Sequence, residues 1–184
     1  MAHRGLCSRR EADALIAAGS IKVDGVAVVM GGKYPAQVKI EIDGQGEASL
    51  GSKWTIILNK PRGFVSQLPE EDQRAAHELI TLDRFEGELK DMGTICQEAA
   101  KAAVAGRLDR SSRGLLILTT DGRVVSSVTQ GGTFAKKYLV ECIHEVTDDH
   151  IRGLNKMRSL NEWKLKPMEV TSLGPKRLKF VLRE

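Results

Sequence analysis

The sequence has few aromatic residues, few cysteines and no long apolar run. Of its 184 residues, two are Trp, two are Tyr and four are Phe. The three cysteines, Cys7, Cys96 and Cys142, form no Cys-x-x-Cys pair, which gives no support to a zinc site or a disulfide framework. No apolar run approaches the roughly 18 residues of a membrane span, and no signal-peptide core is present. We therefore expect reduced thiols and a cytoplasmic protein, or an organellar one if a transit peptide has been removed.

The composition is that of a globular protein with a mildly basic charge. Hydrophobic residues make up 41% and charged residues 28%, with a net charge of +4 and a pI near 9.0. This balance permits nucleic-acid binding without requiring it. The length allows one ordinary domain, or a small domain followed by a medium one.

The most informative pattern of charged residues lies between residues 106 and 122. It holds one acid, Asp109, among three arginines: Arg107, Arg110 and Arg113. The run Leu115–Thr119 then predicts a buried strand. Nearby cations favour the charged form of an acid, which suits a nucleophile that must stay ionised. It suits a structural ion pair equally well, so the pattern alone leaves both interpretations open.

The first part of the chain predicts a helix and a hairpin. Ser8 and Glu11 have the spacing of a capping box, and Gly19 ends the helix. Asp24-Gly25 between two apolar runs predicts a tight hairpin. Arg9 and Arg10 oppose the helix dipole in the first turn, so they are either solvated surface residues or part of a phosphate site.

The middle of the chain begins with a predicted linker at residues 44–52, rich in Gly and Ser. A strand over residues 54–58 follows, then a loop over residues 59–63 on which Lys60 and Arg62 could contact phosphate. Residues 70–105 are less readable, with helices expected at residues 72–80 and 97–103. His77 reads as a surface or half-buried histidine and not as a catalytic base.

The last part of the chain alternates helices and strands. We expect helices at residues 123–130 and 147–157, and strands at residues 136–141, 164–171 and 177–182, with a flexible loop at residues 131–133. Tyr138 is either a half-buried strand tyrosine or a ring that stacks on a nucleobase, with Lys136 and Lys137 beside it for phosphate.

The order Gly-Arg-Leu-Asp, Ser, Gly-Leu-Leu and Asp-Gly over residues 106–122 resembles the catalytic-aspartate signature of RNA pseudouridine synthases. Lys-x-Tyr-Leu-Val at residues 136–140 resembles the family's second active-site motif, and the Asn-Lys-Pro-x-Gly loop is also similar. Residues 6–43 resemble the alpha-L RNA-binding motif shared with a small-subunit ribosomal protein. The resemblance is to the branch of ribosomal RNA enzymes that carry this motif at the N-terminus. Relative to that branch the chain looks shortened at both ends, and residues 70–105 look like an insertion.

The resemblance implies a role for each of several residues. Asp109 would be the catalytic carboxylate, Arg107 would fill the space vacated by the extruded base, Tyr138 would stack on that base and Leu182 would wall the pocket. Residues expected to follow the RNA backbone are Arg9, Arg10, Lys22, Lys60, Arg62, Lys136 and Lys137. The reaction requires no metal and no organic cofactor.

We therefore predict an α+β protein with two domains. Residues 1–46 would form a clipped alpha-L RNA-binding motif domain, and residues 47–184 a mixed, mainly antiparallel pseudouridine synthase sheet flanked by helices. The predicted activity is isomerisation of a uridine in ribosomal RNA, by a monomer without membrane contact or small-molecule cofactor. The alternative is a non-catalytic RNA-binding or ribosome-assembly protein on the same fold.

Overall fold

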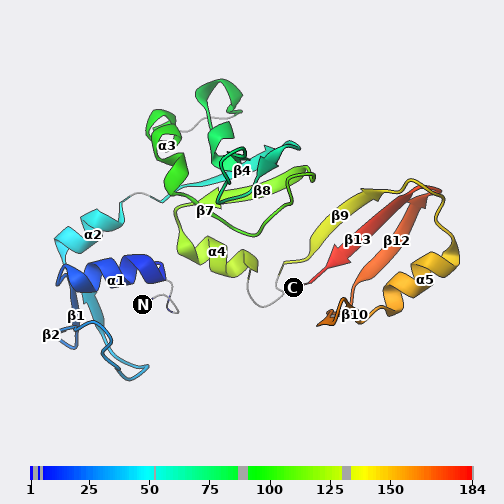
Figure 1. Ribbon diagram of the computed structural model, residues 1–184. Coiled ribbons are helices and arrows are strands. Elements are labelled where there is room, and N and C mark those ends of the chain that lie inside the picture. Colours follow the sequence, from blue (N-terminus) through cyan, green and yellow to red (C-terminus); the bar gives the residue numbers. More distant parts are fainter. Residues whose placement is uncertain (2–3, 5, 52, 87–90, 130–133, 184) are drawn as a thin grey trace. The chain divides into compact units, whose positions relative to one another are not determined.

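The computed structural model describes residues 1, 4, 6–51, 53–86, 91–129 and 134–183. Its contacts divide the chain into two units, Met1–Ser126 and Ser127–Glu184 (Figure 1). Within the described ranges, no helix combines the length and the hydropathy that a bilayer crossing requires.

The N-terminal part of the first unit is a small α/β segment with its own apolar core. Its elements are α1 (Arg9–Ala17), β1 (Ile21–Val23), β2 (Val26–Ala27), β3 (Ile40–Ile42) and α2 (Gly44–Leu50). The predicted capping box is confirmed, because Ser8 Oγ accepts from the Glu11 N–H and the Glu11 carboxylate accepts from the Ser8 N–H. The predicted hairpin is also confirmed, with β1 antiparallel to both β2 and β3. Cys7, Leu15 and Ile21 form the buried centre of this segment.

The predicted linker at residues 44–52 is wrong for most of its length, because Gly44–Leu50 forms helix α2. Asp43 caps this helix by accepting from the Gly46 N–H at 2.7 Å. Gly46 is buried, and a Cβ there would lie 2.7 Å from Ile42 Cγ2 and 2.9 Å from Ser20 Cβ. The glycine that suggested a linker therefore allows α2 to pack closely on this core.

The rest of the first unit is built around an antiparallel sheet of order β4-β8-β7. The strands are β4 (Thr55–Lys60), β7 (Ala103–Val104) and β8 (Gly114–Thr119). Leu116 and Leu118 on β8 are buried with Ile56 on β4, whereas Leu115 points to the other face and is 64% exposed. The strand predicted at Leu115–Thr119 is thus confirmed, but it alternates between a core face and an open face.

The segment between β4 and β7 differs from its predicted helices. It contains a parallel pair, β5 (Phe64–Val65) and β6 (Arg74–Ala75), a 3-10 helix (Ala76–Leu79), a 3-10 helix (Leu82–Arg84), helix α3 (Met92–Glu98) and a 3-10 helix (Ala99–Lys101). Residues 72–80 do not form an α-helix, because β6 pairs with β5 and Glu78 accepts from the Ala75 N–H to start a 3-10 turn instead. The helix expected at residues 97–103 is misplaced. Helix α3 begins earlier, at Met92, and Ala103 belongs to β7, which pairs with β8.

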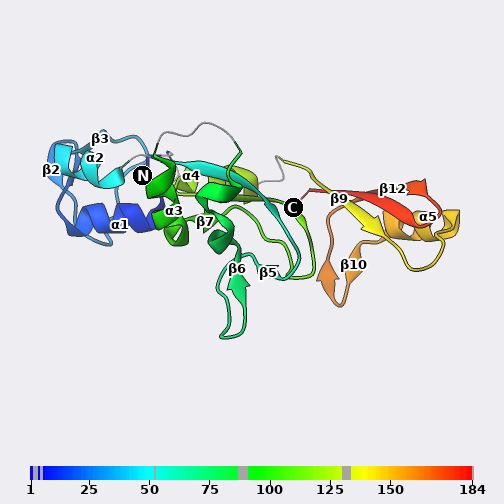
Figure 2. The same ribbon diagram turned by 90° about the horizontal axis from the view of Figure 1, so that it is seen from above.

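Helix α4 (Gly122–Thr129) follows β8 and leads into the second unit. That unit contains β9 (Lys136–Glu141), α5 (Asp148–Lys156), β10 (Ser159–Leu160), β11 (Trp163–Lys164), β12 (Glu169–Gly174) and β13 (Arg177–Leu182). The sheet order is β12-β13-β9, all antiparallel, and β10 pairs with β11 in a separate hairpin (Figure 2). The Asn155 side chain bonds the backbone N–H and C=O of Val170, which fixes α5 to β12.

The predicted strands at residues 136–141 and 177–182 and the helix capped by Thr147 are confirmed. The strand expected over residues 164–171 is two strands, β11 and β12, separated by a segment that contains Pro167, which has no N–H to donate to a ladder. The loop predicted at residues 131–133 lies outside the described residues. The fold is a mixed α/β structure with mainly antiparallel sheets, as predicted.

Candidate active site

Asp109 lies on the loop that joins β7 to β8, within the first unit. The loop leaves the sheet after Ala105, whose N–H donates to the Ile117 carbonyl at 2.9 Å. It re-enters the sheet at Gly114, whose φ of +130° is a backbone conformation that favours glycine. Asp109, Arg107, Arg110 and Arg113 are all exposed on this loop. A charged, solvent-accessible segment is therefore fixed to the sheet at both ends.

The first anchor of the loop is Ser66, a buried residue that follows β5. Its hydroxyl accepts from the Leu108 N–H at 2.8 Å and donates to the Leu108 carbonyl at 2.6 Å. The Leu108 side chain packs against the core of the first unit. The residue immediately before Asp109 is thus held through both its backbone and its side chain.

The second anchor joins the residue that follows Asp109 to the turn after β4. The Gly63 N–H donates to the Arg110 carbonyl at 2.8 Å, and Arg110 Nε donates to the Gly63 carbonyl at 3.3 Å. The Ser112 N–H donates to the Asp109 carbonyl at 3.0 Å, which closes a turn directly after the acid. The backbone on both sides of Asp109 is therefore hydrogen-bonded.

The third anchor is Lys60, and it corrects the sequence interpretation of this residue. Lys60 is the last residue of β4, not part of a loop, and it is fully buried. Its ammonium donates to the carbonyls of Phe64 and Ser112 at 2.8 Å and of Pro61 at 3.1 Å. Because those bonds use its three N–H groups, Lys60 is not available to bind an RNA phosphate.

Burial lowers the pKa of Lys60, and the charge of Asp109 opposes that shift. The carboxylate and the buried ammonium therefore interact electrostatically. Within the described part of the chain, Asp109 forms no salt bridge, with these arginines or with any other cation. The described residues thus offer no partner for the structural ion pair that the sequence also allowed, and Asp109 is exposed.

The second unit brings together the other residues predicted for the site. Tyr138 lies opposite Phe180, and Lys136 opposite Leu182, in the β9–β13 ladder. Residues directly opposite each other, and residues two apart on one strand, share a face of a sheet. Lys136, Tyr138 and Leu182 therefore lie on one face, while Lys137 lies on the other. Tyr138 and Leu182 are half-buried there.

The remaining predicted RNA contacts lie on the surface of the first unit. Arg9 and Arg10 occupy the first turn of α1, Lys22 lies on β1, and Arg62 lies in the turn after β4. All four are exposed, and no ion pair involves them in the residues described. Their charges are thus accessible to an anion.

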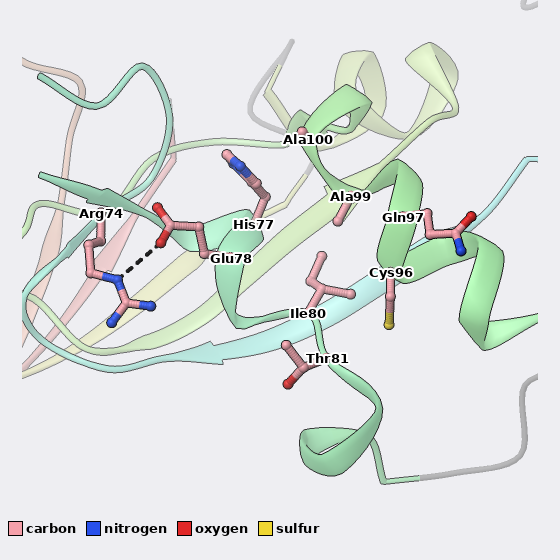
Figure 3. Close-up of a pocket in the computed structure, with 9 residues that line it drawn as sticks. All are labelled: Arg74, His77, Glu78, Ile80, Thr81, Cys96, Gln97, Ala99 and Ala100. Atoms are coloured by element: carbon pink, nitrogen blue, oxygen red, sulfur yellow. Dashed lines mark hydrogen bonds and ion pairs between the residues drawn. The ribbon is translucent and has the colours of Figure 1, made fainter. Parts of the chain in front are cut away.

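A hollow of about 520 Å³ lies away from the Asp109 loop, between the 3-10 helix that follows β6 and helix α3 (Figure 3). Its lining includes Arg74 and Glu78, which form an ion pair at 3.0 Å, and also His77 and Cys96. Arg74 is further fixed by stacking on the Phe64 ring, 4.9 Å from its centroid. His77 is half-buried, as predicted.

Sequence reasoning did not identify Ser66 or Gly63 as anchors of the Asp109 loop. Ser66 lies 42 positions before Leu108, and nothing in its neighbourhood marks it as a hydrogen-bond partner of that residue. The Asn-Lys-Pro-x-Gly motif did point to the right segment, but it indicated a surface loop where the structure has a buried strand end.

The described residues thus combine a mixed α/β fold, an anchored loop with an exposed carboxylate, and several exposed cations. The family model for RNA pseudouridylate synthases matches residues 54–174, well over half of the chain. The chain belongs to this family.

The relatives that the chain resembles carry names of the same family. The chain is 29% identical over 154 residues to the dual-specificity RNA pseudouridine synthase RluF of Escherichia coli K12, covering 82% of this chain and 48% of the relative. It is 26% identical over 179 residues to an uncharacterized RNA pseudouridine synthase of Aquifex aeolicus, covering 96% and 69%. It is 29% identical over 156 residues to ribosomal large subunit pseudouridine synthase B of Xylella fastidiosa, covering 83% and 30%. The chain thus spans about half the length of the RluF relatives that it matches.

A solved structure described as a pseudouridylate synthase has the same fold. It superposes with a TM-score of 0.57 at 21% identity, over 98% of this chain and 74% of that one. At this identity the likeness concerns the fold.

Proposed function

We propose that this protein is an RNA pseudouridine synthase that isomerises a uridine of ribosomal RNA, with Asp109 as the catalytic carboxylate. The observation that carries the proposal is the Asp109 loop. Its backbone is fixed on both sides of the acid by Ser66, Gly63 and Lys60, while the carboxylate itself has no ion-pair partner among the described residues. A nucleophile or charge-stabilising group needs this combination of fixed position and free charge.

The reaction breaks the bond between ribose C1′ and uracil N1, turns the base, and joins C1′ to C5. N1 gains a proton and C5 loses one, so the product is an isomer and no redox change occurs. The carboxylate would stabilise the separated state by attack or by charge. We propose that Arg107 fills the space left by the extruded base, that Tyr138 stacks on the base, and that Leu182 walls the pocket.

We further propose that residues 1–46 are an alpha-L RNA-binding motif domain and that residues 47–184 carry the catalytic fold. The exposed cations Arg9, Arg10 and Lys22 support RNA binding by the N-terminal segment, because nothing in the described structure neutralises them. Arg62, Lys136 and Lys137 would also contact the RNA backbone. Lys60 is left out of this set because it is buried.

The test is release of tritium from ribosomal RNA labelled at uracil C5. We expect release by the protein and only background release by the Asp109→Asn variant, which keeps the size of the side chain and removes its charge. Ser111→Ala is the matched control, because Ser111 is exposed on the same loop and its hydroxyl has no hydrogen-bond partner among the described residues. It should retain activity.

RNA binding by Asp109→Asn should stay within a factor of a few of the unaltered protein, which would separate loss of chemistry from loss of fold. Tritium release by Asp109→Asn would remove Asp109 from the mechanism. RNA binding without release by any form of the protein would favour the non-catalytic alternative.

A further inference from the structure

One of the two tryptophans is exposed where an apolar ring has no structural reason to be. Trp163 is 78% exposed on β11, and its cross-strand neighbour Leu160 on β10 is 54% exposed. Figure 2 shows their hairpin extending away from the β12-β13-β9 sheet of the same unit. Tryptophan is usually well covered in folded proteins and is enriched at binding surfaces, so a ring this exposed suggests contact with a partner.

The hairpin is built to hold this ring in one place. Asn161 and Glu162 have φ values of +47° and +69°, the pair of left-handed residues that a two-residue hairpin turn requires. Below the strands, the Leu165 N–H donates to the Arg158 carbonyl at 2.9 Å. Arg158 Nη1 in turn donates to the Asn155 and Met157 carbonyls at the end of α5. The ring therefore sits on a short, braced support.

The charged residues of the hairpin and of the segments that flank it are mostly cations. Within residues 156–166 there are four exposed cations and one carboxylate, Glu162. The cations are Lys156, Arg158, Lys164 and Lys166. None of the three lysines forms a salt bridge in the part of the chain that is described. Exposed aromatic rings among unpaired cations are the features with which proteins bind single-stranded nucleic acid.

The chemistry favours RNA over a protein partner. A stable protein interface buries roughly 800 Å² of surface on each partner, and two exposed apolar side chains offer much less area than this. A single ring is enough for RNA, because every base offers a face on which to stack and every nucleotide brings a phosphate for a lysine.

We propose that the β10–β11 hairpin is a second RNA contact, at which Trp163 stacks on an unpaired base while Lys164 and Lys166 contact its phosphates. This rests on the proposed function only in that the substrate is RNA. It does not depend on Asp109, and none of the residues that resemble the family's motifs belongs to the hairpin.

Tryptophan fluorescence tests the contact directly. In a Trp54→Phe protein Trp163 is the only indole, and the substitution sacrifices no side-chain hydrogen bond because Trp54 Nε1 is buried without a partner. A short single-stranded oligouridylate and total ribosomal RNA should each quench this emission saturably. The reciprocal Trp163→Phe protein, whose one indole is the core residue Trp54, should show no such change. No quenching of Trp163 at saturating RNA would overturn the proposal, and so would equal quenching by inorganic polyphosphate, which has no bases.

Affinity gives a second, independent measure. Trp163→Ala should weaken oligouridylate binding about 5- to 150-fold, the equivalent of the ~1–3 kcal/mol per stacked base, whereas Trp163→Phe should retain most of the affinity. Leu173→Ala removes an apolar side chain on β12 that is 49% exposed, and it serves as the control with unchanged affinity. The Lys164→Gln/Lys166→Gln double variant should reduce the slope of log affinity against log salt by about 0.7 for each lysine.

The two proposals fail separately. Quenching of Trp163 by RNA without tritium release would support the proposed RNA contact and refute the proposed activity. Tritium release by Trp163→Ala, with its affinity for RNA unchanged, would support the proposed activity and refute the proposed RNA contact.

Discussion

The hydroxyl of Ser66 should determine how firmly the Asp109 loop is held. Ser66→Ala removes both hydrogen bonds to Leu108 and leaves a backbone N–H and a backbone C=O without a protein partner. Ser66 is 6% exposed, and each unsatisfied buried group costs about 1–3 kcal/mol. A hollow of about 170 Å³ lies beside Ser66, and water there could replace part of the lost hydrogen bonding. We therefore expect the free energy of unfolding to fall by ~2 kcal/mol in total, the lower end of the range for two groups.

The assay is equilibrium urea unfolding followed by Trp54 fluorescence in a Trp163→Phe background. Trp54 packs against the core of the first unit, so its emission reports on the unit that holds the loop. Ser112→Ala is the matched control, because Ser112 lies on the same loop and bonds Lys60 through its backbone carbonyl, which the substitution retains. In the tritium-release assay Ser66→Ala should lower the turnover rate while leaving RNA affinity unchanged. If Ser66→Ala and Ser112→Ala agree in stability within about 0.5 kcal/mol, the anchoring argument is refuted.

Two further predictions concern stability in the same unit. Gly46→Ala should lower the free energy of unfolding by about 1–3 kcal/mol, because the added Cβ meets Ile42 Cγ2 at 2.7 Å. In the control Gly44→Ala, in the same helix, the added Cβ meets nothing within 4 Å, so this variant should be neutral or stabilising. Equal urea midpoints for the two variants would contradict the packing argument. The second prediction is a pH effect. Hydrogen bonding to Arg123 lowers the pKa of Asp121 below its usual 3.8. The ionised pair therefore stabilises the fold fully above pH 3.8, and this stabilisation is lost as the pH falls through the lowered pKa. Arg123→Gln should lower the free energy of unfolding only slightly at pH 6, since Arg123 is largely exposed and solvent screens the pair. The difference from the unaltered protein should vanish in acid, and a difference that persists at the lowest pH would contradict the argument.

The elements that the sequence predicted well are those determined by local signals. The capping box at Ser8, the Asp24-Gly25 turn and the Thr147 cap each involve residues at most three apart, and the structure has all of them. The strand before Asp121 was likewise visible as an apolar run. Local chemistry is sufficient where the partners of a residue are its neighbours in the chain.

The predictions that failed depend on partners distant in sequence. Lys60 reads as a loop cation beside a proline, yet β8 extends its strand and the Ser112 carbonyl, 52 positions away, accepts one of its hydrogen bonds. Gly46 reads as a linker residue, yet it is small because Ile42 and Ser20 leave no room for a Cβ. Asp109 itself was recognised from its motif, whereas the anchors that hold it became visible only in three dimensions.

The anchors of the Asp109 loop have one property in common that bears on how such a protein can change. Lys60 and Ser66 both bond main-chain atoms of the loop, and the Gly63 N–H bonds a main-chain carbonyl. The position of Asp109 therefore depends mainly on main-chain hydrogen bonds, to which the Leu108 side chain and the Arg110 guanidinium add one contact each. Arg107 and Arg113, whose side chains make no hydrogen bond among the described residues, can be exchanged for other residues without removing any of these anchors. Substitutions at those two positions would change the charge of the loop, residues 106–113, while the main chain at Asp109 stays in place.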